Sequence, residues 1–388
     1  MHRRQFIRVA GGGVVLAATA TATAAGCSSS MPPEAIASWQ GPGDEPDLRR
    51  WILGYAILAP HSHNLQSWVV DLSVPDQILL RCDLQRLLPE TDPYSRQIMM
   101  SQGTFIELLD LAARERGQRA EIRLFPEGEF GPDKVDGRPV ASIRLVPDAS
   151  VAKDPLFAQI LARRTNRSAY DPARPVPDTA WQAMAEAVKP YPLRFGFAGA
   201  DQPDALQQQR AVAAAAWRIE MLTPRTVMES YKVLRVGPAE IVQHRDGISL
   251  LSPMVVWLDR LGLFDRSRAP GPEDFATTSQ IEDFDAKLAS TPAFLWMVSE
   301  GNDRITQVQA GRAYARVQLA ATQQGVVMQP LQQALQEYAE QAKPYADIRR
   351  LLGAGATTQT VQMWARVGFA PPVEPAPRRG IDAHILRA

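Results

Sequence analysis

The sequence predicts an α+β fold in a chain of enzyme size. Apolar residues recur at helical spacing in several stretches and concentrate in short strand-like runs in others. These stretches follow one another in two similar rounds without a strict strand–helix–strand rhythm, which argues against a parallel α/β sheet. With 388 residues and only two cysteines, Cys27 and Cys82, the chain must rely on its apolar core, and it is long enough for one.

The first round, residues 47–150, begins with a helix that Asp47 can cap and that must end before Pro60. Short strands are expected in two pairs, 68–74 with 78–82 and 121–125 with 141–146. A long helix lies between the pairs. Its apolar residues Ile98, Phe105, Leu109 and Ala112 share one face, and Gly117 ends it.

The second round, residues 151–388, is longer. Its expected elements are a helix at 156–161, a strand at 193–198, a helix at 211–222, a strand at 293–299 and a helix at 303–324. The stretch 224–292 is rich in Pro, Gly and Asp, which predicts an irregular insertion. Loops of that length are uncommon unless functional, so we expect this insertion to cover a site as a lid.

Residues 1–26 have the pattern of a twin-arginine signal peptide. Arg3 and Arg4 precede Gln5-Phe6-Ile7 and a weakly apolar run too rich in Gly and Thr to span a membrane. The run leads to Cys27, and residues 24–27 resemble a lipoprotein cleavage box, although Ala24 stands where Leu is usual. We expect the twin-arginine translocase to export the chain to the periplasm or cell envelope, with either lipidation of Cys27 or ordinary cleavage near Ala25.

Residues 27–46 contain several Ser and Pro residues and few large apolar side chains, which is typical of a flexible tether. The chain carries 42 basic and 42 acidic residues, and this balance argues against nucleic acid as the main partner. The common signatures of hydrolases, phosphate-binding loops, dithiol redox sites and dinucleotide sites are all missing from the sequence.

The first of three polar clusters is Pro60-His61-Ser62-His63-Asn64-Leu65-Gln66-Ser67-Trp68, where a helix breaks. Its short polar side chains and free backbone N–H groups suit contacts to a small molecule, but the same composition also fits a plain polar loop. His61 and His63 could in principle bind a metal ion. They lack a third ligand nearby, so no metal site is predicted.

The second cluster is Arg163-Arg164-Thr165-Asn166-Arg167. Guanidinium groups match the oxygens of a phosphate monoester in pairs, so this segment could hold one. Arginines at a helix end are also commonly just solvated. The third cluster, Arg378-Arg379, follows a proline-rich turn after Arg366 and could close on the same phosphate from the other side.

In this order the three clusters resemble the nitroreductase superfamily of FMN proteins, and most closely its double-length single-chain branch, the Acg-like flavin oxidoreductases. The resemblance runs from about Leu48 to Leu386. The flavin-contacting pattern Pro-Ser-Ser-x-Asn-x-Gln-Pro-Trp is kept except at His61, which replaces a Ser, and at Ser67, which replaces a Pro. Further blocks at 88–93 and 310–333 are also similar to the family's.

The resemblance implies FMN as cofactor and names its contacts. Those residues are Pro60, His61, Ser62, Asn64 and Gln66 at the ring, and Arg163, Arg164, Thr165, Arg167, Arg378 and Arg379 at the phosphate. Amides such as those of Asn64 and Gln66 can pair with the uracil-like rim of the ring, and a backbone N–H of Ser62 or His63 can steady charge at its N5 atom.

The resemblance also implies two nitroreductase-like halves in one chain, 47–150 and 151–388, which together imitate a two-subunit dimer and let the chain work as a monomer. Two functions stay open. One is an oxidoreductase that passes two electrons through FMN to a small nitro, quinone or similar acceptor. The other is a protein that binds or sequesters FMN. Export weakens a reaction driven by NAD(P)H, because reduced nicotinamides are kept inside the cell.

Overall fold

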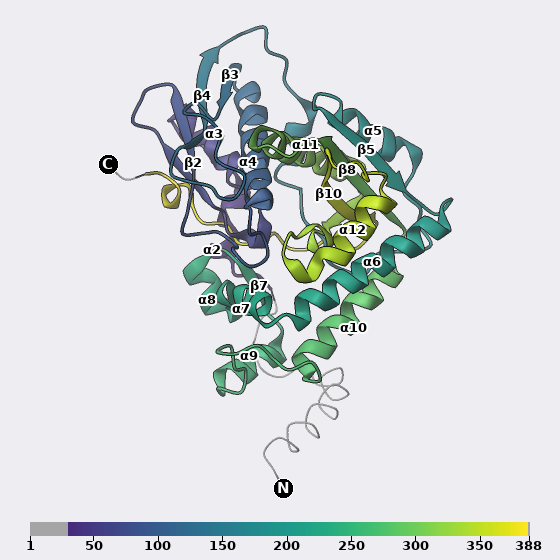
Figure 1. The fold of residues 1–388 in the computed structure, drawn as a ribbon. Coiled ribbons are helices and arrows are strands. Elements are labelled where there is room, and N and C mark those ends of the chain that lie inside the picture. Colours follow the sequence, from purple (N-terminus) through teal and green to yellow (C-terminus); the bar gives the residue numbers. More distant parts are fainter. Residues whose placement is uncertain (1–29, 387–388) are drawn as a thin grey trace.

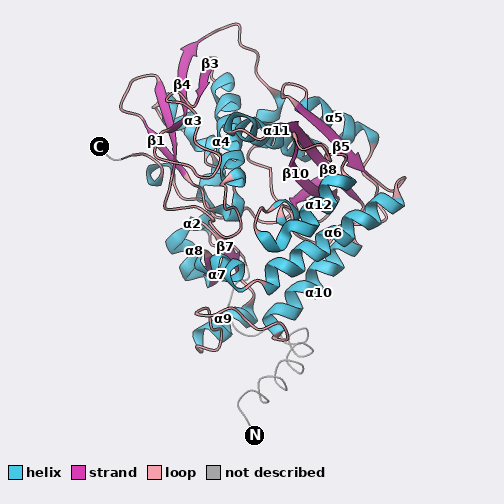
Figure 2. Cartoon of the chain, viewed as in Figure 1, coloured by secondary structure: helices cyan, strands magenta, loops and turns pink. Residues whose placement is uncertain are grey.

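Two four-stranded antiparallel sheets with the same strand plan organise the chain, whose computed structural model describes residues 30–386 (Figures 1 and 2). The first sheet has the order β1-β2-β4-β3 and the second the order β5-β8-β10-β9. In chain order, the first two strands of each sheet precede a long helix. The third strand along the chain, β3 or β9, lies at an edge, and the fourth, β4 or β10, lies inside. Predicted signal residues such as Arg3, Arg4 and Cys27 lie outside the described part of the chain.

The first half follows the predicted order. Its elements are α3 (Leu48–Ala56), β1 (Trp68–Asp71), β2 (Gln77–Cys82), α4 (Arg96–Glu115), β3 (Gln118–Leu124) and β4 (Pro139–Pro147). Asp47 caps α3 as predicted, because its side chain accepts hydrogen bonds from the backbone N–H groups of Arg49 and Arg50. All four strands of the sequence prediction are confirmed here, with ends shifted by at most a few residues.

The second half repeats this order with additions. Its sheet and core helices are α5 (Asp178–Val188), β5 (Leu193–Ala198), β8 (Ala293–Glu300), α11 (Arg304–Gln323), β9 (Val327–Pro330), α12 (Ala342–Leu351) and β10 (Gln359–Gly368). The helix predicted at 156–161 is instead a 3-10 turn at Pro155–Gln159. Strand β10 was not predicted, because Gln362 and Arg366 interrupt its apolar pattern. Both side chains are buried and hydrogen bonded, to Ser299 and Gln329 among others.

The helices α4 and α11 form the largest contact between the two halves. Both are 20 residues long, and each has a glycine at its eighth position, Gly103 and Gly311. A Cβ on Gly103 would lie 1.9 Å from the carbonyl oxygen of Val308, and one on Gly311 would lie 1.8 Å from that of Met100. The two backbones therefore touch at a crossing that only glycine permits.

The stretch 224–292 is helical, so the prediction of an irregular insertion was wrong. The whole addition between β5 and β8 comprises α6 (Pro203–Leu222), α7 (Pro224–Lys232), β6 (Leu234–Val236), α8 (Gly237–His244), β7 (Ile248–Leu250), α9 (Pro253–Arg260) and α10 (Phe275–Ala289). Proline in the first turn of α6, α7, α8 and α9 starts these helices, since its missing N–H is not needed there. The prolines therefore begin helices instead of breaking them.

Residues 30–46 are packed, which corrects the tether prediction for this part of the chain. They include the short helix α2 (Pro33–Ile36), and Trp39 is only 6% exposed. At the other end of the chain, Val70 of β1 exchanges backbone hydrogen bonds with His384 and Leu386, so the C-terminal segment returns to the first sheet. No helix within residues 30–386 has the length and apolar character needed to cross a bilayer.

Candidate functional site

The loop 60–67 has an unusual backbone. His63, Asn64 and Gln66 have positive φ angles of 48°, 53° and 56°, a conformation that non-glycine residues seldom adopt. Such strain persists only where surrounding contacts hold it, and it is concentrated at functional sites. The loop is held from α4, because Thr104 donates to the Pro60 carbonyl (2.7 Å) and the Ser62 N–H donates to the Ser101 hydroxyl (3.2 Å).

Both ring nitrogens of His61 are engaged within the loop. Nδ1 lies 2.8 Å from the Ser62 carbonyl oxygen, and Nε2 accepts from the Ser67 N–H at 3.1 Å. Burial lowers the pKa of His61 to about 3, and the positive charges of Arg378 and Arg379 act in the same direction. His61 is therefore neutral, carries its proton on Nδ1, and has no free nitrogen for a metal ion.

The amides of Asn64 and Gln66 face other parts of the protein. Asn64 donates to the Pro377 carbonyl (3.1 Å) and accepts from the Arg378 guanidinium (2.5 Å). Gln66 is fully buried, donates to the Arg245 carbonyl (2.9 Å) and accepts from the Arg379 N–H (3.0 Å). In this structure the two amides join the loop to the C-terminal segment and the insertion.

Arg163 contacts the chain just before the loop. This buried side chain donates to the Leu58 carbonyl (2.8 Å) and to the Gln318 side chain (3.0 Å). Gln318 in turn donates to the Thr165 hydroxyl at 3.3 Å, so α11 positions the arginine-rich segment. Arg378, from the opposite end of the chain, donates to the same Leu58 carbonyl at 3.2 Å.

Trp39 connects these groups, and sequence reasoning missed it. The guanidinium carbons of Arg163, Arg164 and Arg378 lie 5.4, 4.3 and 5.2 Å from the centre of its indole ring. Its Nε1 donates to the Ala376 carbonyl at 2.8 Å. We call Arg163, Arg164 and Arg378 the arginine cluster. A single large aromatic residue in a proline-rich stretch was the only signal in the sequence.

No described residue neutralises the arginine cluster. Among the described residues, no carboxylate forms an ion pair with any of its three members or with Arg167 or Arg379. Burial lowers the pKa of Arg163 to about 10 and that of Arg378 well below its usual value. The Nε atoms of Arg163, Arg378 and Arg379 are buried without a hydrogen-bond partner in the part of the chain that the structure describes. This concentration of positive charge fits an anionic ligand.

Arg167 differs from the other arginines of the site. Its side chain is partly exposed, although burial around the guanidinium lowers its pKa, and within residues 30–386 it makes no hydrogen bond or ion pair. Burial lowers the pKa of His63 to about 4, and the positive charge of Arg167 acts in the same direction. The His63 ring has only long contacts, 3.5 Å to the Ser62 hydroxyl and 3.4 Å to that of Ser230. Arg167 and His63 are thus the least engaged polar groups of the site.

The insertion reaches the loop with the part between α7 and β7. Ser230 of α7 faces His63, and the Gly247 N–H donates to the Asn64 carbonyl at 3.1 Å. Asp246 is buried and forms ion pairs with Arg86 beside the loop and with Arg235 of the insertion. These contacts attach the insertion to the loop and leave its cover function a prediction.

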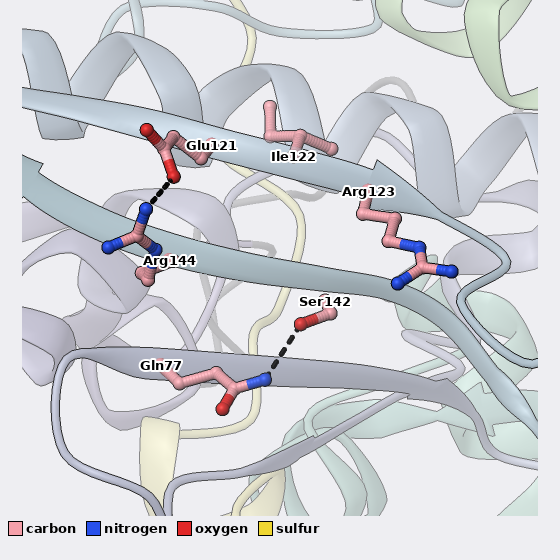
Figure 3. A pocket seen from close by; sticks show the side chains of 6 residues that line it. All are labelled: Gln77, Glu121, Ile122, Arg123, Ser142 and Arg144. Atoms are coloured by element: carbon pink, nitrogen blue, oxygen red, sulfur yellow. Dashed lines mark hydrogen bonds and ion pairs between the residues drawn. The ribbon is translucent and has the colours of Figure 1, made fainter.

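A surface depression elsewhere is unrelated to this site (Figure 3). It lies on the strands β2, β3 and β4, where Gln77 donates to Ser142 and Arg144 pairs with Glu121. Gln77 begins β2, whereas the loop joins β1 at Trp68, which pairs with Cys82 at the other end of β2. The depression is therefore a feature of the first sheet, away from the loop.

Comparisons with known proteins identify relatives of nearly full length. Two Mycobacterium tuberculosis proteins, from strains CDC 1551 and H37Rv, carry the provisional name NAD(P)H nitroreductase. Each is 30% identical to this chain over 356 residues, which cover 86% of this chain and 89% of the relative. No family model matches the chain.

Solved nitroreductase structures are more distantly similar. An FMN-dependent nitroreductase from Mycobacterium smegmatis in complex with NADPH is 15% identical, with a TM-score of 0.36, over 59% of this chain and 96% of that one. An FMN- and NADPH-dependent nitroreductase from Sphigopyxis sp. strain HMH is 17% identical, with a TM-score of 0.37, over 61% of this chain and 99% of that one.

Proposed function

This chain belongs to the nitroreductase family, and from that premise we propose that it is an exported FMN-dependent oxidoreductase. Its acceptor is a small nitro compound, quinone or similar molecule. We place it in the double-length single-chain branch, the Acg-like flavin oxidoreductases. The M. tuberculosis relatives support this placement, because they match both halves of the chain in one alignment.

The unneutralised arginine cluster beside a strained loop is the observation that carries the proposal. Arg163, Arg164 and Arg378 converge there from two distant segments, and no carboxylate of residues 30–386 pairs with them. The donor set fits the phosphate end of FMN, since guanidinium groups in a poorly solvated site attract a doubly charged anion strongly. When bound, FMN supplies the chemistry of two-electron transfer.

The residues divide into two groups around the cofactor. Arg167 has a free guanidinium group and would contact the phosphate, while the arginine cluster behind it supplies positive potential. The flavin ring would lie at the loop 60–67, on the side of His63. The amides of Asn64 and Gln66 would act through the loop, because their hydrogen bonds fix its backbone.

We further propose that the two sheets are the halves of a pseudo-dimer, so that a single chain is functional. Three features support this: the shared strand order, the equal length of α4 and α11, and their matching glycines at the crossing. The motif of the loop 60–67 has no counterpart in the second half of the sequence, and the arginine-rich motif at 163–167 has none in the first half. One flavin per chain follows from this distribution.

Purification from the cytoplasm followed by an absorbance spectrum tests the proposal. We expect about one non-covalent FMN per chain. Turnover of nitro compounds and quinones with NAD(P)H, and with other reductants, then separates an enzyme from a protein that only sequesters flavin. A colourless protein that does not take up added FMN would refute the flavin proposal. Bound FMN that no reductant and acceptor can cycle would favour sequestration.

Export is tested separately through Arg3 and Arg4. Replacing both by Lys should leave the precursor inside the cell, since the translocase reads the arginine pair. Fractionation and blotting of the periplasm would show the loss of exported protein. Unchanged export of the variant would remove the twin-arginine proposal and leave the flavin proposal standing.

A further inference from the structure

The helix α9 and the turn after it expose large apolar side chains. Trp257 is 60% exposed, Leu261 52% and Leu263 56%. Trp257 lies in the last turn of α9, Leu261 is its C-cap residue and Leu263 follows in the turn. We call these three residues the α9 patch. Exposed apolar side chains are normal when scattered, whereas three within seven residues indicate an interaction surface.

The described N-terminal end of the chain lies on the same part of the molecule as the α9 patch. The helix α2 packs against α8. The first residue of α8, Gly237, approaches Val256 of α9 so closely that a Cβ there would lie 3.3 Å from its side chain. Figure 1 shows α2, α8 and α9 together on one side of the molecule, away from α5 and β5. The chain thus enters the fold on this side of the molecule, where the Met31 N–H donates to Glu374 at 2.8 Å and α8 lies between α2 and α9.

This position matters because Cys27 lies three residues before Ser30, the first described residue. Three extended residues span at most about 10 Å. A lipid chain on Cys27 would therefore hold the bilayer against the part of the insertion that contains α9. The patch would lie at the level of the headgroups, where the rings of Trp are favoured.

Two arginines beside the α9 patch are paired, whereas Arg260 of α9 is exposed and forms no ion pair within the described residues. Arg266 pairs with Glu240 at 2.8 Å and approaches Asp259 at 3.4 Å, and Arg268 pairs with Asp265 at 3.1 Å. A surface that bound nucleic acid or an acidic protein would show several unpaired basic groups around its rim, and one arginine does not amount to that. The surface chemistry favours apolar insertion with little electrostatic attraction.

We propose that the α9 patch is a membrane-contact surface that inserts Trp257, Leu261 and Leu263 into the interface of a phospholipid bilayer. The contact orients the protein on the membrane, with α9 lying in the bilayer plane. It acts beside the N-terminal attachment and does not depend on it. It is also independent of the proposed flavin chemistry, because none of the three residues contacts the loop 60–67.

Vesicle flotation of a chain that begins at Ser28 tests the patch without an acyl group. Removing residues 1–27 affects none of the described contacts, since these all lie within residues 30–386. We expect the chain to float with phosphatidylcholine vesicles, with little change when phosphatidylglycerol is added or salt is raised. The triple variant W257S/L261S/L263S should bind at least about tenfold more weakly.

A matched variant controls for lost apolar surface. V74S/L84S/L386S also replaces three exposed apolar side chains, none of which belongs to the insertion, and should bind vesicles as the parent does. Brominated lipid should quench Trp fluorescence of the parent more than that of Trp257→Phe. Thermal melting of all variants checks folding, and the single variant Leu261→Ser provides a milder version.

Three results would overturn the proposal. The first is a parent chain that stays in solution beneath the vesicles. The second is equal loss of binding in the control triple variant, which would make the effect unspecific. The third is concentration-dependent self-association that W257S/L261S/L263S abolishes in the absence of vesicle binding. In that case, the patch joins two copies of the chain and does not contact lipid.

Discussion

The guanidinium carbon of Arg164 lies 4.3 Å from the centre of the Trp39 indole ring, so the N-terminal segment is fixed to the arginine-rich segment by a cation–π contact. Arg163 and Arg378 contact the same ring. The positive edge of the site is therefore assembled from three parts of the chain that are far apart in sequence. Trp39 shields it from solvent without neutralising it.

Trp39→Ala should destabilise the protein strongly. The ring is buried, and its removal leaves a cavity together with an unpaired Ala376 carbonyl, so we expect a loss of about 3 to 5 kcal/mol in the free energy of unfolding. Urea unfolding followed by circular dichroism measures it. Trp39→Phe keeps an aromatic face and should cost less. Unchanged stability of the alanine variant would mean that residues 30–46 do not pack as described.

Arg167→Ala should weaken FMN binding without weakening the fold. Its side chain has no partner among the described residues, so its removal breaks no native contact. A charge-assisted contact to phosphate is worth about 1.5 to 3 kcal/mol, so the FMN dissociation constant should rise roughly tenfold to a hundredfold. Fluorescence titration with FMN measures the change.

Riboflavin is the control for Arg167, because it has the same ring without a phosphate. Its affinity should not change in Arg167→Ala. Arg379→Ala is a useful contrast, since the Arg379 side chain also donates to the Gln66 carbonyl and its loss should disturb the loop as well. If both arginines hold one phosphate, their effects on FMN should be non-additive. A double variant that binds FMN as tightly as the parent would remove both residues from the site.

Gly103→Ala should prevent the two halves from packing. The added methyl group would lie 1.9 Å from the Val308 carbonyl oxygen, so the helices α4 and α11 must move apart along their whole contact. We expect loss of soluble protein, or a melting temperature lowered by well over 10 °C. For a chain of this size, a loss of about 1 kcal/mol lowers the melting temperature by a few degrees. Gly311→Ala should do the same.

The matched control is Gly355→Ala, where a Cβ meets nothing within 4 Å and the backbone has no positive φ. It should melt close to the parent. A soluble Gly103→Ala variant with the melting temperature of the parent would contradict the tight helix crossing, and with it one of the three features that support a pseudo-dimer.

Local signals explain which elements the sequence predicted well. The helix α11 was placed almost to the residue, because Asp303 caps it and Gly325 follows its end. Strand β10 was missed, because its buried Gln362 and Arg366 find their partners on neighbouring strands that the sequence does not bring next to them. The packing of Trp39 was also missed, because its partners Arg164 and Arg378 are far from it in sequence.

The site shows the same division between local sequence signals and tertiary contacts. Motif spacing identified the loop and both arginine segments, and the structure brings Asn64, Gln66, Arg378 and Arg379 into direct contact. Motif spacing could not predict that the two amides are already hydrogen bonded. Their acceptors are distant in sequence: Arg245 is 179 residues from Gln66, and Pro377 is 313 residues from Asn64. Residue types indicate what a side chain can bind, and tertiary contacts decide whether it is free to do so.

The buried carboxyl group of Glu220 should make stability depend on pH. Glu220 lies at the end of α6, accepts a hydrogen bond from Gln336 at 2.8 Å and forms no ion pair within the described residues. Burial raises its pKa from 4.5 to about 7, since the charged form loses its hydration there. The folded state therefore binds this proton more tightly than the unfolded state does.

The sign of the effect follows from that difference. The contribution of Glu220 to stability is fully present below about pH 4.5, falls as the pH rises toward 7 and is lost above it, and the total change is about 3 kcal/mol. His61 and His63 have lowered pKa values and act in the opposite direction at acidic pH, so the parent curve alone is not diagnostic. Glu220→Gln isolates the carboxyl group, because the amide cannot ionise. Urea unfolding at pH 5 and pH 8 should show the variant gaining stability relative to the parent at pH 8. An equal difference between variant and parent at both pH values would show that Glu220 is ionised throughout.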